Sequence, residues 1–162
     1  MSGVFAVINE NSNLNFEEFI GSLEEYGYGS ILYEVVGKGI IGMVSSVKCL
    51  KKQDFIESFG DVTVCLSGYF YRDELQRISK LSCPRIIFEW YTNNKLSSIK
   101  KFTGNFSFIL YDASKEKIII GNDISGQNRI FFKHEKNSLI VSPKLESLVK
   151  LLNNKPELHK NS

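Results

Sequence analysis

The alternating apolar pattern that begins at Phe102 is the feature of this sequence that most constrains its fold. Phe102, Phe106 and Phe108 fall on one face at strand spacing, a polar turn follows at 112–116, and a second apolar stretch occupies 117–120. Alternation with a period of two residues indicates β-strands, and two such stretches joined by a short turn indicate a hairpin. We therefore expect an antiparallel sheet, because the strands of a hairpin run in opposite directions.

Shorter apolar stretches, bounded by glycine or polar turn residues, predict further strands. They are 4–8, 31–36, 39–47, 62–66, 130–133 and 138–141. Gly37-Lys38 is expected to join the second of these to the third by a tight turn, and Ser67-Gly68 to form a turn after the fourth. Residues 54–59 fit a short helix and a loop equally well.

Four stretches have the apolar spacing of amphipathic helices. They cover 16–26, 73–80, 84–93 and 143–152. Asn15 is placed to cap the first of them, and Pro84 suits the first turn of the third because its missing N–H would have no partner there. Since strands and helices are grouped along the chain instead of alternating, we expect antiparallel sheets with helices packed outside them, which is an α+β architecture.

The totals exclude several classes of function. The chain has 162 residues, enough for one domain, and its 20 basic and 18 acidic residues are mixed along the sequence, so we expect no nucleic-acid partner. It contains neither a signal peptide nor an apolar stretch of about 18 residues, so we expect a cytoplasmic protein without membrane contact. Its three cysteines form no C-x-x-C pair, so we expect reduced thiols and no metal. No nucleotide-binding motif is present, and no cofactor is expected.

The first eight residues, MSGVFAVI, place a hydroxyl residue directly after the initiator methionine. If Met1 is removed, Ser2 carries both a hydroxyl group and a free α-amine. An α-amine has a pKa of about 7.7–8.0 and can act as the general base for its own side chain, so Ser2 is a candidate N-terminal nucleophile. The same residues also fit an ordinary buried first strand.

Six segments of the chain together carry a family resemblance. They are MSGVFAVI at 1–8, LSGYFYRDEL at 66–75, IIFEWY at 86–91, FTGNFSFILYD at 102–112, GNDISGQNRIFF at 121–132 and VSPKLESLVKLL at 141–152. In order and spacing they resemble the class II, N-terminal-nucleophile type of glutamine amidotransferase domain found in asparagine synthetase and its relatives. The most specific are FTGNFSFILYD and NDISGQNRIFF, which are similar to the family patterns L-N-G-M-F-A-F-x-L-Y-D and R-D-R-F-G-x-x-P-L-Y-Y.

The resemblance implies a four-layer αββα sandwich of two antiparallel sheets, of the Ntn-hydrolase-like type. The amidotransferase-like domain would span 1–152, and 153–162 would form a polar C-terminal tail. The S-G-G-x-D-S motif of the family's ATP-binding synthetase domain is not in the sequence. The resemblance therefore implies a separate synthetase chain, or a second copy in a homodimer, as the partner.

The resemblance also implies where the site lies and how it differs from the family. The family's nucleophile is a cysteine directly after the initiator methionine, where this chain has Ser2. The family's Asn-Gly-Glu turn, which stabilises the oxyanion and holds the glutamine amide, reads Ser67-Gly68-Tyr69. Cys83 takes the place of an Asp that binds the substrate's amino group. The segment GMVSS at 42–46 lacks the Arg that pairs with the substrate's carboxylate.

These replacements argue against glutaminase activity. Loss of one oxyanion donor costs roughly 10²–10³ in turnover, and two charged contacts worth about 1.5–3 kcal/mol each are missing. We therefore expect a stand-alone, degenerate amidotransferase-like domain, a pseudoenzyme that acts as a partner or regulatory subunit of a synthetase. Two alternatives stay open: an N-terminal serine amidohydrolase on the same scaffold, and a metabolite-binding sensor that uses the vacated pocket.

Overall fold

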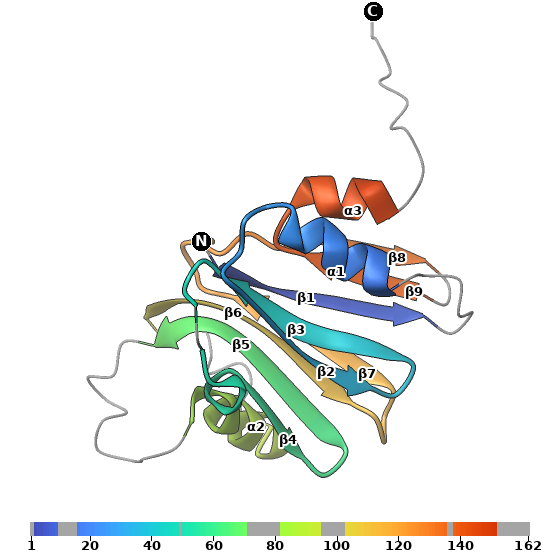
Figure 1. Ribbon diagram of the computed structural model, residues 1–162. Coiled ribbons are helices and arrows are strands. Elements are labelled where there is room, and N and C mark those ends of the chain that lie inside the picture. The colour runs from blue at the N-terminus through green and yellow to red at the C-terminus, as the bar shows by residue number, and fades with distance from the viewer. Residues whose placement is uncertain are drawn as a thin grey trace, which may run out of the picture.

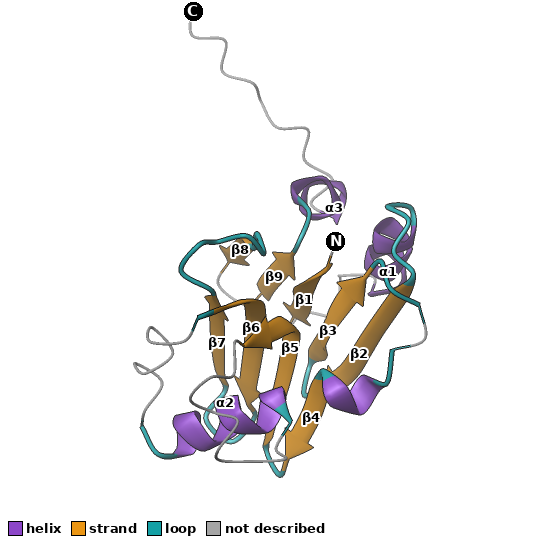
Figure 2. Ribbon diagram, turned by 90° about the vertical axis from the view of Figure 1, so that its left-hand side faces the viewer, coloured by secondary structure: helices purple, strands orange, loops and turns teal. Residues whose placement is uncertain are grey.

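The computed structural model describes residues 2–9, 16–48, 50–70, 82–94, 103–135 and 138–151. In these ranges the chain forms nine β-strands, three α-helices and one short 3-10 helix. The strands make two antiparallel sheets that pack face to face, with helices on the outer faces (Figures 1 and 2). The predicted α+β fold with two antiparallel sheets is confirmed, and the order of its layers is that of the expected αββα sandwich.

The first sheet has β1 (Ser2–Asn9) at its centre. Its strand order is β2-β3-β1-β9-β8, so both neighbours of β1 come from distant parts of the chain. The other members are β2 (Ser30–Val36), β3 (Gly39–Ser45), β8 (Phe131–Glu135) and β9 (Ser138–Ser142). The predicted pair of strands 31–36 and 39–47 is confirmed. The predicted strands 130–133 and 138–141 correspond to β8 and β9, which pair with each other. In the register of β1 with β3, Ser2 lies opposite Ser45.

The second sheet contains the hairpin that the alternation from Phe102 predicted. β6 (Gly104–Asp112) pairs with β7 (Lys117–Asn122) across the turn at 113–116. The other members are β4 (Ile56–Phe59) and β5 (Val62–Phe70), in the order β4-β5-β6-β7. Residues 54–59, which fitted a helix and a loop equally well, contain the last residue of the 3-10 helix η1 (Lys52–Asp54) and then β4.

The predicted turn at Ser67-Gly68 is wrong, because β5 continues through both residues to Phe70. Each of them has a partner on β6: Ser67 lies opposite Ser107, and Gly68 lies opposite Phe106. Gly68 has a φ of +99°, a backbone angle that glycine adopts without strain. The glycine therefore bends the strand without ending it, and the ladder with β6 supplies the hydrogen bonds that keep it extended.

Three α-helices cover the outer faces. α1 (Phe16–Glu24) and α3 (Leu145–Leu151) lie over the first sheet, and α2 (Cys83–Thr92) lies over the second (Figure 1). α1 is shorter than the predicted 16–26 because its last turn tightens and Gly27 takes a φ of +72°. The Asn15 cap, the predicted helix at 73–80, Phe102, Cys49 and the tail 153–162 lie outside the described residues.

Apolar side chains fill the three spaces between the layers. The cluster between the two sheets contains Val4, Ala6, Ile41, Met43, Cys65, Ile109 and Val141. The cluster under α2 contains Val64, Leu66, Ile87, Phe106, Phe108 and Leu110. The cluster under α1 and α3 contains Phe5, Val7, Phe19, Leu23, Ile140 and Leu148. Consecutive residues of β1, β5 and β6 thus alternate between two clusters, as residues of a strand buried on both faces do.

Ser82 caps α2, and replacing it with alanine is expected to destabilise the fold by about 1 kcal/mol. Its hydroxyl oxygen accepts a hydrogen bond of 3.3 Å from the backbone N–H of Arg85, and the hydroxyl donates to the Glu57 carboxylate. Urea unfolding monitored by circular dichroism measures the change. Ser82→Thr keeps the capping oxygen and is the control; equal loss in the two variants would contradict a capping role.

Candidate functional site

Strand alternation decides where the Ser2 side chain lies. Val4 and Ala6 of β1 belong to the cluster between the sheets, and Ser2 is two residues before Val4 on the same face. Its partner across the ladder, Ser45, is buried. Ser2 is itself half-buried at the end of the strand. The candidate nucleophile therefore stands at the polar end of the apolar layer between the two sheets.

Two further serines face the same layer from the second sheet. Ser67 lies two residues after Cys65 on β5, and Ser107 lies two residues before Ile109 on β6; both Cys65 and Ile109 belong to the cluster between the sheets. Ser67 and Ser107 lie opposite each other and are fully buried. Neither hydroxyl oxygen has a hydrogen-bond partner among the described residues. Buried hydroxyl groups without a partner are uncommon and favour a role in binding or in internal hydration.

The end of β5 is fixed by its contact with β6. A Cβ atom at Gly68 would lie 1.9 Å from the carbonyl oxygen of Asn105, so no other residue fits there without movement of the backbone. Tyr69, opposite Asn105, is 51% exposed at the rim. Of the Ser67-Gly68-Tyr69 segment, Gly68 thus has a structural role, and Tyr69 presents a phenol ring where the resemblance implies a carboxylate.

The loop 123–130, between β7 and β8, is held against β6 by hydrogen bonds, two of them to the buried side chains of Asp123 and Asn128. The Asn105 amide donates to the Gln127 side chain at 2.7 Å, and the Asn128 amide donates to Asn105. The backbone N–H of Asp123 donates to Phe106 O at 2.9 Å, and its carboxylate accepts from the backbone N–H of Phe106 at 3.3 Å. These contacts fix the loop on the end of β6, and they involve residues that are about 17 to 23 positions apart in the sequence.

The Asp123 carboxylate stays ionised in this buried position. Burial raises its pKa, but hydrogen bonds from the Ser125 hydroxyl and from the backbone N–H groups of Phe106, Gln127 and Gly126 lower the pKa below the usual aspartate value. The short spacing of Asp123 and Ser125, followed by Gly126, is the sequence signal that could have identified this turn. The charge holds the loop to β6, because its hydrogen bonds come both from Phe106 on that strand and from residues of the loop itself.

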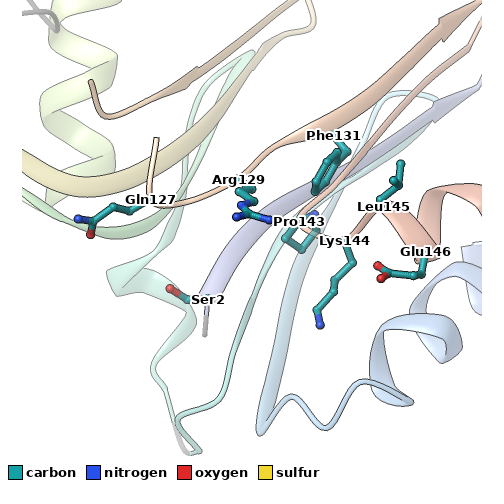
Figure 3. Close-up of a pocket in the computed structure, with 8 residues that line it drawn as sticks. All are labelled: Ser2, Gln127, Arg129, Phe131, Pro143, Lys144, Leu145 and Glu146. Carbon is teal, nitrogen blue, oxygen red and sulfur yellow. The ribbon is translucent and has the colours of Figure 1, made fainter. Parts of the chain in front are cut away.

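A cavity of about 570 Å³ opens beside Ser2 (Figure 3). Its polar lining consists of Ser2, Gln127, Arg129, Lys144 and Glu146, and its apolar lining consists of Phe131, Pro143 and Leu145. These residues come from β1, the loop 123–130, β8 and the start of α3. The cavity is therefore assembled from segments that are distant in the sequence and meet at one end of the first sheet.

Of the charged residues among the described lining of the cavity, Lys144 and Glu146 interact with tyrosines near α1. The Lys144 ammonium lies 4.9 Å from the centre of the Tyr26 ring. Burial, together with the nearby charge of Glu146, raises the pKa of Tyr28. Arg129 is exposed, and among the described residues it has neither an ion pair nor a hydrogen bond to its guanidinium group. Arg129 is thus a cation of the cavity that is available to a ligand.

The structure brings only part of the predicted site together. Ser2 lines the cavity, whereas Ser67, Gly68 and Tyr69 of β5 are not among its lining residues. Cys83, the first residue of α2, packs against the cluster under that helix, on the opposite face of the second sheet from Ser67. The structure therefore does not place Cys83 beside Ser2. Sequence reasoning missed Arg129, Lys144 and Glu146.

The described thiols and acids provide no other obvious chemistry. Burial raises the pKa of the Cys65 thiol, which suits an apolar core residue and disfavours a reactive thiolate. Within the described ranges, no group of three or more His, Cys, Asp or Glu side chains is placed to hold a metal ion. Of the helices that the structure describes, none has the length and apolar character needed to cross a membrane.

Comparison of the sequence with known proteins identifies a family. The family model described as "Glutamine amidotransferase domain" matches residues 42–162, a range that begins within β3 and does not include β1. The chain is also 24% identical over 106 residues to Amidase chry2 of Gibberella zeae, and the matched part is 60% of this chain and 16% of that protein. Because the family match covers well over half of the sequence, the chain belongs to the family of glutamine amidotransferase domains.

Proposed function

We propose that this amidotransferase domain does not hydrolyse glutamine and that it serves as a partner or regulatory subunit of a synthetase related to asparagine synthetase. The observation that carries the proposal is the uncharged set of side chains at the positions of the family pocket. The four β3 residues 42–45 are buried and include no basic residue, and Tyr69 stands where the resemblance implies a glutamate. None of these side chains is charged, so none of them can pair with the ammonium or the carboxylate group of free glutamine.

The chemistry of the nucleophile supports the same conclusion. A cysteine thiol has a pKa of about 8.5 and is partly ionised at neutral pH, whereas a serine hydroxyl depends entirely on a neighbouring base. Removal of one oxyanion donor costs roughly 10²–10³ in turnover, and Ser67 takes the place of the donor asparagine. We extend the proposal to a domain spanning 1–152 with 153–162 as a polar tail, in the cytoplasm, where the free thiols Cys65 and Cys83 would stay reduced.

Exposed apolar side chains near the cavity support a role in association. Ile124 in the loop 123–130 is 80% exposed, and Phe132 on β8 is 64% exposed. A contiguous exposed apolar patch favours contact with another protein, and we propose that these two side chains contribute to one. Purification of the tagged chain from its native source tests this role, with a synthetase chain as the expected companion. Elution of the chain alone, at the mass of one copy, would contradict the proposal.

Changing Ser2 to cysteine is expected to leave glutamine hydrolysis at the level of a protein-free blank. The new thiol is a better nucleophile than the hydroxyl, but the variant still lacks the Arg and the Asp with which, as the resemblance implies, the family holds the substrate's two charges. Release of glutamate, measured for the wild-type chain and for Ser2→Cys, checks this expectation. Intact mass spectrometry of both proteins is the control, because Met1 must be removed for either side chain to act as an N-terminal nucleophile.

Glutamate release by Ser2→Cys well above the blank would show that the pocket still binds glutamine and that only the nucleophile is missing. Release by the wild-type chain would contradict the proposal directly.

The position of Ser2 in the cavity favours one alternative function, an N-terminal serine amidohydrolase acting on an amide other than free glutamine. The similarity to a protein named as an amidase supports it further. This function requires removal of Met1, so that the α-amine of Ser2 is free to act as the base. A measured mass that includes Met1 in the protein from its native source would end this alternative.

A further inference from the structure

We propose that the cavity at Ser2 binds a small organic carboxylate, with its anionic group against Arg129 and its apolar body against Phe131 and Leu145. The inference does not rest on the proposed function, because binding of such a ligand requires neither glutamine hydrolysis nor a synthetase partner.

Arg129 supplies the charge that selects the ligand. Arg129 is exposed at the end of the loop 123–130 and lines the cavity. It has no ion pair among the described residues, while Lys144 lies over the Tyr26 ring and Glu146 lies near Tyr28. A guanidinium group presents a planar fork of N–H donors that matches the two oxygens of a carboxylate.

The backbone on which Arg129 stands is held in place before any ligand arrives. The preceding residue, Asn128, is buried, and its amide donates to Asn105. Gln127 accepts from Asn105 at 2.7 Å, and Asp123 ties the start of the loop to β6. A site on a fixed backbone binds more tightly, because less conformational freedom is lost on binding.

The rest of the lining decides what kind of anion fits. Leu145, which is 49% exposed, lines the cavity together with Phe131 and Pro143. The apolar part of a ligand would therefore cover apolar surface that now faces water. A volume of about 570 Å³ lies within the range of small-molecule pockets, roughly 300–1,000 Å³. Two cations against one carboxylate disfavour a cationic ligand (Figure 3).

Binding of 3-phenylpropionate to the full chain, followed by isothermal titration calorimetry and by NMR chemical shifts, tests the proposal. The neutral isostere 3-phenylpropanamide is expected to bind at least tenfold more weakly, because it cannot make charge-assisted hydrogen bonds. Inorganic phosphate and free glutamine, which lack the apolar body, are also expected to bind more weakly. Equal affinity for the propionate and its amide, or no binding of 3-phenylpropionate at millimolar concentration, would overturn the proposal. Equal affinity for phosphate would overturn the assignment of the apolar body.

Matched variants assign the binding to residues. Arg129→Gln keeps a polar side chain without the charge and is expected to weaken 3-phenylpropionate binding at least tenfold. The control is Arg85→Gln, which changes an exposed arginine on α2 that is not part of the cavity lining and should bind 3-phenylpropionate as the wild-type chain does.

Leu145→Ala tests the apolar contact and should weaken the binding of 3-phenylpropionate but not the binding of acetate. Unfolding midpoints confirm that each variant is folded, and unchanged affinity in Arg129→Gln would overturn the assignment of the carboxylate to Arg129. The glutamate-release assay tests the proposed function separately. A negative result for carboxylate binding therefore does not contradict the proposed function, and the reverse also holds.

Discussion

Replacing Gly68 with alanine is expected to lower the free energy of unfolding by about 2–6 kcal/mol. Two costs add in this variant. Gly68 has a φ of +99°, where a residue with a side chain is strained by about 1–3 kcal/mol. The new Cβ would also lie 1.9 Å from the Asn105 carbonyl oxygen, so β5 and β6 would have to separate, and overpacking of this kind costs about 1–3 kcal/mol.

Gly60→Ala separates the two costs. Gly60 also has a positive φ, of +62°, but a Cβ atom there would meet nothing within 4 Å. Its replacement is expected to cost only about 1–2 kcal/mol, the penalty of the left-handed backbone alone. Urea unfolding of the two variants measures the difference, and a loss in Gly68→Ala no larger than that in Gly60→Ala would contradict the steric argument.

The role of Gly68 bears on how the family resemblance is interpreted. In the Ser67-Gly68-Tyr69 segment it is the only residue that matches the Asn-Gly-Glu turn. Its positive φ and its close approach to Asn105 explain its presence without any contribution to catalysis. The presence of glycine at position 68 is therefore explained by the backbone conformation of β5, and it is not evidence for glutaminase activity.

The strands were predictable from the sequence because their signal is local. The alternation from Phe102 and the Gly37-Lys38 turn each follow from residues that are neighbours in the chain, and the structure contains both hairpins. The extension of β5 through Ser67-Gly68 was not predictable in the same way. It depends on nine paired residues of β6, a partner that lies far along the sequence.

The cavity was less predictable than the fold. Ser2 could be identified from its place after Met1, but Arg129 and Glu146 are separated from it by most of the chain and meet it only through the order of strands β3-β1-β9-β8. Cys83 shows the opposite limit. The resemblance aligns it with a pocket position, yet the face of α2 on which it lies is set by packing under that helix. Alignment along a sequence does not determine which side of a sheet a helix covers.

Changing Asp112 to asparagine is expected to destabilise the protein by about 2–3 kcal/mol at pH 7, mainly through the loss of charge-assisted hydrogen bonds. Asp112 ends β6 and is 1% exposed. Its carboxylate accepts from the Tyr91 hydroxyl at 2.6 Å and from the Ser114 hydroxyl at 2.6 Å. It also accepts from the backbone N–H of Lys115 at 3.1 Å and pairs with the Lys115 ammonium at 3.1 Å. One side chain thus joins α2 to the second sheet and closes the β6–β7 turn.

The effect of this variant should depend on pH in a defined direction. Hydrogen bonds from Ser114 and Tyr91, opposed by burial and supported by Lys115, hold the pKa of Asp112 well below its usual value. A group whose pKa is lower in the folded state stabilises the fold above its unfolded pKa, about 3.9 for aspartate, and loses that stabilisation as the pH falls through the folded value. The gap in unfolding free energy between the wild-type chain and Asp112→Asn is therefore expected to be full at pH 7 and to narrow below about pH 4.

Two further variants make this expectation specific. Asp61→Asn changes an exposed aspartate in the β4–β5 turn and should alter the free energy of unfolding by less than about 0.5 kcal/mol at either pH. Tyr91→Phe removes the donor of one hydrogen bond, and in the double variant with Asp112→Asn its cost should be smaller than in the wild-type background, because the two groups share that bond. Additive losses, or a gap for Asp112→Asn that stays constant between pH 7 and pH 3, would show that the carboxylate does not hold α2 to the sheet through its charge.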